Sequence, residues 1–186
     1  MLVKSISGTS SKTNTATVFH GSTHLFDAID VKMGKPYKDF GRGFYVTYKR
    51  SHAANLALRN KKLEQKYNRD CNAYLYTFEM SLEHIDNFNL MNFREASPDW
   101  LKFVLANRKS KHCAHNYDIV MGPTANDDTM TVLNAYLDGL YGEVDSDEAL
   151  QILMKFIMPD VLPRQAFFAT TKSVSILTRK GDVEIL

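Results

Sequence analysis

The stretch Asp39-Phe40-Gly41-Arg42-Gly43-Phe44-Tyr45-Val46-Thr47 says most about the fold of this chain. Its two glycines, one residue apart, permit a tight turn in which the backbone can approach another group closely. The aromatic and β-branched residues that follow predict a strand over residues 44–48. This is not the dinucleotide-binding fingerprint of a Rossmann fold, because the third glycine is missing and the glycines precede a strand instead of opening a helix. By itself the stretch is also typical of a glycine-rich hairpin with aromatic core residues.

A second segment, Val18-Phe19-His20-Gly21-Ser22, lies upstream of the first. Residues 17–20 have the composition of a short strand, which Gly21 is expected to end. A histidine at a strand end can hydrogen-bond a ligand, and the following glycine leaves the backbone N–H and C=O open to close approach. Alone, this segment is equally typical of a strand end without any function.

Apolar residues at helical spacing, with capping residues before them, predict the helices of the chain. We expect helices over residues 24–29, from Ser51 to about Tyr67, from Ser97-Pro98 onward, from Asn126 or Asp127 onward, and from Ser146 to about Met158. Further strands are expected over residues 73–80, 117–121, 165–170, 173–177 and 182–186, and a loop over residues 32–40. Helices and strands mix without a regular βαβ alternation, so the predicted fold class is α+β.

Length and composition are those of an ordinary globular domain, with 186 residues, 44% hydrophobic and 24% charged. Residues 1–16 are polar and lack an apolar period, so we expect a flexible lead-in followed by a single domain over residues 17–186. No apolar run approaches the roughly 20 residues that span a bilayer, and the N-terminal segment lacks the apolar core of a signal peptide. A cytoplasmic protein without membrane contact is therefore expected.

The sequence predicts no metal site. Cys71 and Cys113 are not spaced as a CxxC pair. Five histidines share no metal-ligand spacing and are expected on the surface: His24, His52, His84, His112 and His115. The basic run over residues 108–112 is interpreted as a solvated loop, with contact to an acidic or nucleic-acid acceptor as the alternative.

Taken together and in this order, the segments resemble the ADP-ribosyltransferase superfamily of the diphtheria-toxin and poly(ADP-ribose) polymerase type. The closest resemblance is to a bacterial family of uncharacterised domains grouped with that superfamily, and it spans about residues 17 to 177. The segments that carry it are His20-Gly21-Ser22, Phe40-Gly41-Arg42-Gly43-Phe44-Tyr45, Ser51-His52-Ala53-Ala54-Asn55, Tyr117-Asp118-Ile119-Val120-Met121-Gly122-Pro123 and Gln165-Ala166-Phe167-Phe168-Ala169-Thr170.

The resemblance implies a split antiparallel β-sheet with flanking helices and a cleft for NAD between the two half-sheets. It implies that His20 hydrogen-bonds a ribose hydroxyl, that the Gly21 backbone pairs with the nicotinamide carboxamide, and that Tyr45 stacks on the nicotinamide ring. Arg42 is expected to meet the pyrophosphate, with a solvated loop arginine as the alternative. The implied NAD-binding set is completed by Ser22, Gly41, Gly43 and Phe44.

The chain departs from the superfamily pattern at the catalytic acid. Gln165 stands where the superfamily has a glutamate, and glutamine can hydrogen-bond a ribose hydroxyl but carries no charge and cannot act as a base. The auxiliary acids expected in its place are Asp127 and Asp128, whose alternative role is to cap a helix N-terminus. Leu56 replaces an expected aromatic residue, and Ala53 replaces a serine.

The implied activity is transfer of a single ADP-ribose from NAD to a macromolecular acceptor, protein or nucleic acid, with release of nicotinamide. Such a glycosyltransferase-type enzyme is typical of a bacterial toxin or defence effector, with a small antitoxin-like protein as partner. Two alternatives stay open: an NAD glycohydrolase, and a catalytically silent module that binds NAD or a related nucleotide and acts through a protein partner.

Overall fold

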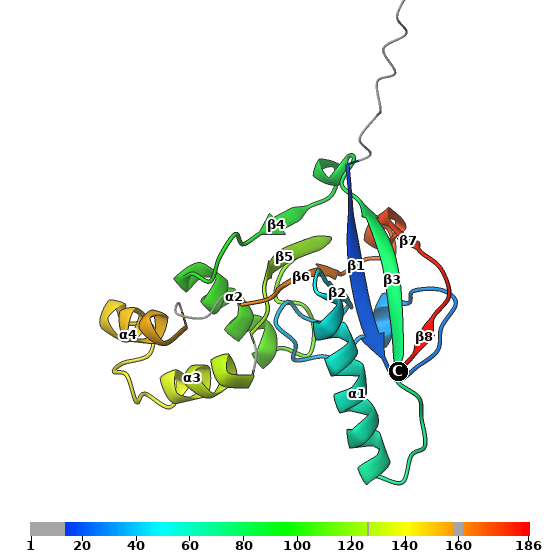
Figure 1. Ribbon diagram of the computed structural model, residues 1–186. Helices are drawn as coiled ribbons and strands as arrows, with labels where there is room; N and C mark the ends of the chain where they lie inside the picture. Colours follow the sequence, from blue (N-terminus) through cyan, green and yellow to red (C-terminus); the bar gives the residue numbers. More distant parts are fainter. Residues whose placement is uncertain (1–13, 126, 158–161) are drawn as a thin grey trace, which may run out of the picture.

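The computed structural model describes residues 14–125, 127–157 and 162–186, which form a mixed α+β fold around one eight-stranded sheet (Figure 1). The strands run in the order β4-β5-β6-β2-β1-β3-β7, and β8 also pairs with β3. Pairing is antiparallel except between β4 and β5. The strands are β1 (Thr15–Ser22), β2 (Phe44–Thr47), β3 (Tyr74–Ser81), β4 (Leu90–Asn92), β5 (Ile119–Pro123), β6 (Arg164–Phe168), β7 (Leu177–Arg179) and β8 (Glu184–Ile185).

The sheet narrows sharply in its middle. Strands β1 and β2 meet through a single residue pair in the described chain, Phe19 with Thr47. By contrast, β1 pairs with β3 along its whole length, and β2 pairs with β6 over four residues. Figure 1 shows β1 and β3 running side by side and steeply inclined to β5 and β6. The sheet therefore consists of two halves joined at β1–β2, as the predicted split sheet requires.

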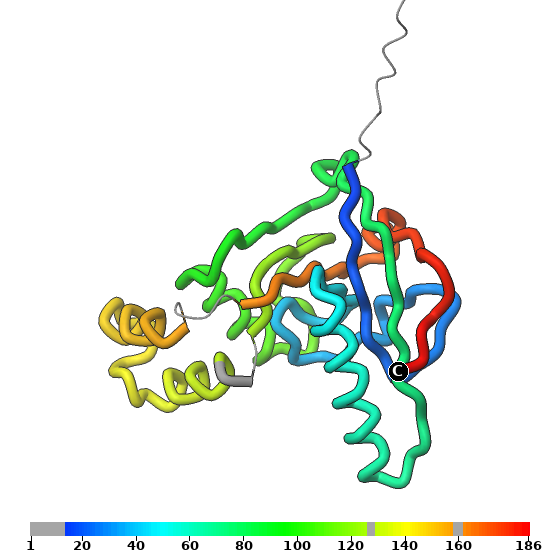
Figure 2. The backbone as a smooth tube through the Cα atoms, viewed as in Figure 1, coloured from blue at the N-terminus to red at the C-terminus, as the bar shows by residue number. Residues whose placement is uncertain are grey.

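Within the described residues four α-helices flank the sheet, and their path is followed in Figure 2. Helix α1 (Arg50–Lys66) packs against β1, β2 and β3. Helices α2 (Pro98–Lys109), α3 (Asp127–Leu137) and α4 (Asp147–Ile157) gather beside the other half of the sheet. None of the helices in the described ranges is long and apolar enough to cross a membrane.

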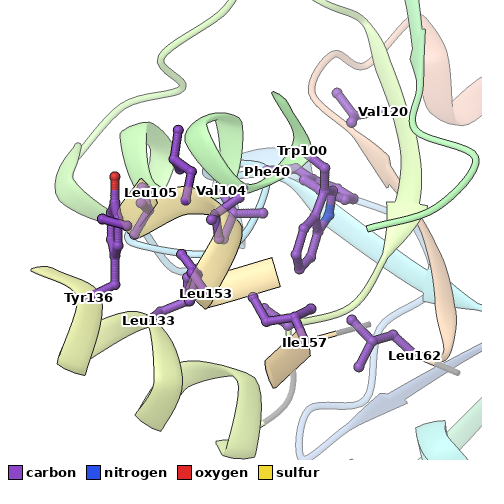
Figure 3. Packing of buried hydrophobic residues seen from close by; sticks show 14 of the residues in the cluster. Phe40, Trp100, Val104, Leu105, Val120, Leu133, Tyr136, Leu153, Ile157 and Leu162 are labelled. Carbon is purple, nitrogen blue, oxygen red and sulfur yellow. The ribbon is translucent and has the colours of Figure 1, made fainter. Parts of the chain in front are cut away.

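Two clusters of buried side chains cover the two faces of the sheet. One joins Phe40, Val120 and Phe167 to α2, α3 and α4. Figure 3 shows Trp100 and Val104 of α2 facing apolar side chains of α3 and α4 in this cluster. On the opposite face, Phe44, Tyr76 and Phe168 pack with the segments that follow β1 and β6. Because side chains alternate along a strand, Phe44 and Tyr45 enter different clusters.

Several predicted elements are confirmed. The strands at residues 44–47 and 74–81 and the helices at 50–66, 98–109 and 147–157 lie where the sequence indicates. Ser97 caps α2 by accepting from the Trp100 backbone N–H, and Ser146 accepts from the Ala149 N–H at the start of α4. Of the candidate caps of α3, Asn126 lies outside the described residues.

Other predictions were wrong. Strand β1 starts at Thr15 and continues through Gly21 to Ser22, so the folded region begins before residue 17; residues 1–13 of the predicted lead-in lie outside the described part. The Lys49 backbone, not Ser51, occupies the N-cap position of α1. Residues 173–176 form a 3₁₀ turn instead of a strand, because the Ser173 hydroxyl donates to the Thr170 carbonyl.

The helix predicted over residues 24–29 is absent from the described chain, which forms a loop there. The Phe26 ring stacks on Tyr76 with centroids 4.1 Å apart, and the Phe26 N–H donates to the Tyr76 hydroxyl at 2.8 Å. The same hydroxyl donates to the His24 carbonyl at 3.1 Å. One tyrosine thus binds two backbone groups of this loop, and the apolar spacing reflects packing on the sheet.

Candidate functional site

The His20 imidazole bridges the two halves of the sheet. Its Nδ1 atom lies 2.7 Å from the Tyr45 carbonyl oxygen, at the point where β1 and β2 cease to pair. A carbonyl only accepts, so Nδ1 carries the proton and Nε2 keeps a lone pair. The half-buried ring stacks on Phe44 with centroids 4.4 Å apart and meets the Phe26 ring edge-on at 5.8 Å.

His20 is neutral at physiological pH. Desolvation among these rings lowers its pKa to about 4, against the smaller opposing effect of the bond to the Tyr45 carbonyl. A neutral imidazole with its proton fixed on Nδ1 offers Nε2 as a hydrogen-bond acceptor. The arrangement is suited to accept a hydrogen bond from a hydroxyl group, such as that of a sugar.

Tyr45 binds the backbone of residues 40–43, which we call the glycine-rich loop. Its hydroxyl donates to the Gly41 carbonyl at 2.7 Å and accepts from the Phe40 N–H at 3.1 Å. Its ring lies 4.9 Å from the Phe167 ring. Burial, with a further contribution from the Asp39 carboxylate, raises the pKa of the phenol well above its usual value, so the group stays protonated. Tyr45 therefore holds the loop in shape, and its stacking on nicotinamide stays a prediction.

The glycines of both segments are required by packing within the chain. A Cβ on Gly21 would collide with the Ala53 carbonyl oxygen of α1, so this helix approaches β1 as closely as it does only because residue 21 is glycine. Gly41 has φ of 94°, a left-handed conformation that favours glycine, and it faces the Cys113 sulfur. The Gly43 position is filled by Phe167 in the same way.

Arg42 and Ser22 bind neighbouring backbone. The exposed Arg42 guanidinium donates to the Gly34 carbonyl at 2.9 Å and also to the Lys32 carbonyl, which ties the glycine-rich loop to the segment before it. The Ser22 hydroxyl accepts from the His24 N–H at 3.0 Å. Contacts of these two residues with NAD stay predictions.

Gln165 belongs to a buried polar cluster around Asp39. The Gln165 side-chain nitrogen donates to Oδ2 of Asp39 at 2.9 Å, and the Ala125 N–H donates to the same oxygen at 3.0 Å. Arg108 donates to Oδ1 through Nε at 2.7 Å and also through a terminal nitrogen. Asp39 is 5% exposed and Gln165 is 8% exposed. A carboxylate and an amide, both buried, are thus held together with a partly exposed guanidinium.

The structure brings only some of the predicted site residues together. His20 contacts the Tyr45 backbone and the Phe44 ring, whereas Gln165 and the Tyr45 ring lie on the opposite face of the sheet with the other cluster. Asp127 and Asp128 begin α3, but their side chains lie outside the described part of the structure. Leu56 is 39% exposed on α1.

Sequence reasoning assigned no role to Asp39 and interpreted Arg108 as part of a solvated basic run. Arg108 instead lies in the last turn of α2 and pairs with the buried Asp39. The local signal for Asp39 was only its place directly before Phe40-Gly41. Its partners lie 69 and 126 residues away, and no local pattern identifies them.

The expectation that His115 is a surface residue was wrong. Its Nδ1 accepts from the Tyr117 N–H at 3.1 Å, so Nε2 carries the proton and donates to the Phe40 carbonyl at 2.9 Å. Its ring stacks on Phe103 with centroids 4.9 Å apart. Burial lowers the pKa of this imidazole, with an opposing effect of the Phe40 bond. His115 therefore also fixes the glycine-rich loop, through the Phe40 carbonyl.

Two open hollows flank these segments. One, of about 380 Å³, is lined by Tyr48, Lys49, Leu162, Pro163 and Arg164, next to the paired residues Thr47 and Gln165. The other, of about 450 Å³, adjoins Ser22 and is lined by Thr23, His24, Leu25, Asp70, Cys71, Asn72 and Tyr74. Among the described residues, no group of three or more His, Cys, Asp or Glu side chains is placed to hold a metal ion.

Comparison with known protein families gives one match, to a family described as "Protein of unknown function (DUF3990)", over residues 16–178. No curated protein and no solved structure matches the chain. The matched range begins within β1 and ends within β7, so it includes His20, the glycine-rich loop and the Asp39–Gln165 cluster. The chain therefore belongs to the DUF3990 family.

Proposed function

We propose that this protein binds NAD at the junction of β1 and β2 and transfers a single ADP-ribose from it to a macromolecular acceptor. The observation that carries the proposal is the hydrogen bond between His20 Nδ1 and the Tyr45 carbonyl. It connects the two segments whose order resembles the ADP-ribosyltransferase superfamily, at the place where the two half-sheets separate.

The chemistry of His20 supports binding of a ribose. Its imidazole is neutral, and its Nε2 atom is the acceptor that a ribose hydroxyl can use as donor. The ring is held by Phe44 and Phe26, so little rotational freedom is lost on binding. A neutral acceptor also avoids placing a fixed positive charge beside a ribose that becomes cationic during the reaction.

In the proposed reaction the bond between nicotinamide and the ribose breaks, and its electron pair leaves with neutral nicotinamide. A nucleophile of the acceptor bonds to the same ribose carbon, and its proton is released to solvent. Positive charge develops on the ribose between these events, so a nearby fixed negative charge lowers the barrier. In the Gln165 cluster the Asp39 carboxylate is paired with the Arg108 guanidinium, so it is not a free negative charge for this step.

A catalytically silent NAD-binding module is the second candidate, and one observation favours it. Gln165 is 8% exposed and its amide already donates to Asp39, so substrate meets little of its surface in this conformation. An NAD glycohydrolase, with water as the acceptor, is the third. The experiment that separates them measures nicotinamide release from NAD by purified protein, with and without cell lysate.

Each outcome selects one function. Label transfer from NAD to a lysate macromolecule supports the transferase. Nicotinamide release in buffer alone, without label transfer, indicates a glycohydrolase. NAD binding without nicotinamide release in either condition indicates the silent module, and a chain that does not bind NAD contradicts the transferase and the glycohydrolase.

His20→Asn tests the site itself. The asparagine amide can replace Nδ1 as donor to the Tyr45 carbonyl, but it removes the Nε2 acceptor. We expect NAD affinity to fall about 3- to 10-fold, as for loss of one hydrogen bond of about 1 kcal/mol, with thermal stability nearly preserved. The matched control is His84→Asn, at an exposed position with φ of 58° that asparagine adopts readily. Unchanged affinity in His20→Asn would place NAD elsewhere.

A further inference from the structure

We infer that this protein associates with a second copy of itself, and that the outer side of α1 in one copy docks on α4 and the α3–α4 connection of the other. The inference goes beyond the proposed function, because the contact involves neither His20 nor NAD. It rests on two exposed surfaces of the chain, each with apolar side chains at its centre, that are bordered by opposite charges.

Helix α4 exposes apolar side chains on the side that faces away from the core. Ile152 and Phe156 are four residues apart and therefore lie on the same side of the helix, where Phe156 is 56% exposed. The Phe156 ring stacks on Tyr141 with centroids 5.4 Å apart. Leu140, in the connection before α4, is 74% exposed. These four residues form what we call the α4 surface, and a contiguous exposed apolar patch of this kind marks a site of association.

Acids border the α4 surface. Residues 138–148, which connect α3 to α4 and begin α4, contain five acids and no lysine or arginine. Glu148 lies one turn before Ile152 on the same side of the helix, and Glu143 is exposed in the connection. Helix α4 itself has one basic residue, Lys155. An apolar patch with such a border favours a partner segment that is both apolar and basic.

The chain itself contains such a segment in α1. This helix buries Ala53 and Ala57 against the sheet. Leu56, Leu63 and Tyr67 follow one another at spacings of seven and four residues, so they form a row along another side of the helix. All three are exposed, and Tyr67 most, at 66%. We call this row the α1 surface.

Basic residues border the α1 surface. Lys62 and Lys66, four residues apart, lie beside the row and are exposed. Over its whole length α1 has five lysine or arginine residues against one acid, Glu64. That acid is bound by Arg69 at 3.0 Å, so its charge is balanced within the chain. The α1 and α4 surfaces therefore attract each other, and their charges determine which surface of one copy meets which surface of the next.

The positions of the two surfaces favour contact between copies. Figure 1 shows α1 and α4 at separate edges of the molecule, so neither covers the other within one chain. With 17 residues α1 is about 25 Å long, and with 11 residues α4 is about 16 Å long, so α1 can cover the whole length of α4. Because each copy offers both surfaces, every copy can make this contact twice.

Charge reversal on each surface tests the contact. One variant carries Lys62→Glu/Lys66→Glu, and the other carries Glu143→Lys/Glu148→Lys. In either variant alone the two surfaces have the same sign of charge. We therefore expect its association constant, measured by sedimentation equilibrium without NAD, to be about 10-fold or more below that of wild type. An equimolar mixture of the two variants pairs opposite charges again, so it should associate about as strongly as wild type.

A single substitution should act in the opposite direction. Lys155→Glu removes the one basic residue of α4, so we expect it to raise the association constant by about 2-fold or more. The matched control is Lys172→Glu, which makes the same change of charge at an exposed position outside both surfaces. This control should associate as wild type does.

Each result decides for or against the inference. Association of wild type, loss in both charge-reversal variants and recovery in their mixture support it. A wild-type chain that stays monomeric up to about 200 μM overturns it, and so does a mixture that fails to recover, which would assign the two surfaces to other partners such as a nucleic acid or a basic protein segment. None of these results depends on NAD cleavage, so the proposed function stands or fails separately.

Discussion

At the scale of single residues, His20 makes the stability of this fold depend on pH. In the folded chain its pKa is about 4, against 6.5 for an unperturbed histidine. The unfolded chain therefore binds a proton at this residue more readily between these values. The contribution of neutral His20 to stability is complete above pH 6.5 and is lost as the pH falls from 6.5 toward 4.

We expect this loss to be at most about 3.5 kcal/mol, since one pKa unit corresponds to about 1.4 kcal/mol. Urea unfolding of wild type and His20→Asn at about pH 5, 6 and 7.5, which cover the upper part of this titration, measures it. His52 and His115 also have lowered pKa values, and they contribute equally to the pH dependence of stability in wild type and in His20→Asn. The difference in the free energy of unfolding between the two proteins therefore isolates His20. The stability of wild type should fall more steeply as the pH decreases. Parallel curves would show that residue 20 does not titrate in this way.

At the scale of elements, the helix starts show where local sequence decides and where it does not. The Ser97 hydroxyl accepts from the Trp100 N–H at 3.2 Å, followed by Pro98 at the first helical position. The start of α1 has no side-chain cap, and Ser51 lies inside the helix. The Thr47–Lys49 segment instead fixes this helix by continuing directly from β2.

Ser97→Ala should therefore destabilise the protein by about 1 kcal/mol, the usual effect of removing an N-cap. Ser51→Ala should change the free energy of unfolding by less than about 0.5 kcal/mol, because serine and alanine differ little within a helix. Chemical denaturation of both variants checks the pair. Equal losses would mean that Ser51 also caps its helix.

The elements that sequence could predict are those whose signal is local. Strand β2 follows from its run of aromatic and β-branched residues, and α4 from Ser146 and the apolar positions after it. The loop after β1 could not be predicted, because Tyr76, 50 residues away, binds the backbone N–H of Phe26. Strand β4 was missed because it has three residues and pairs only with β5 in the described sheet.

At the scale of the whole molecule, the candidate site was only partly predictable. The His20 and Tyr45 segments were identified from their order, and the structure joins them. The Asp39 cluster unites the glycine-rich loop, α2, the segment before α3, and β6. Such a cluster follows from the topology of the sheet. The repeat of apolar residues along a strand, with period 2, or along a helix, with period 3.6, contains no information on it.

The narrow junction of the sheet raises the question of whether its halves unfold together. Trp100 is the only tryptophan, is fully buried, and donates from its ring nitrogen to the Pro123 carbonyl at 3.2 Å. Its fluorescence therefore reports on the half with β5 and β6. Buried residues of β1, β2, β3 and β6 share one cluster, so we expect the fluorescence and far-UV circular dichroism transitions in urea to coincide. Separate midpoints would show independent halves.

The central position of β6 in the sheet affects how the chain folds during its synthesis on the ribosome. Strand β6 lies between β5 and β2 but is synthesised after both of them. Until Arg164–Phe168 has left the exit tunnel, β2 and β5 lack the neighbour that they share, and their aromatic residues stay uncovered. Uncovered strand edges are templates for wrong pairing. We therefore expect β2 and β5 of the nascent chain to be open to wrong pairing until β6 has emerged.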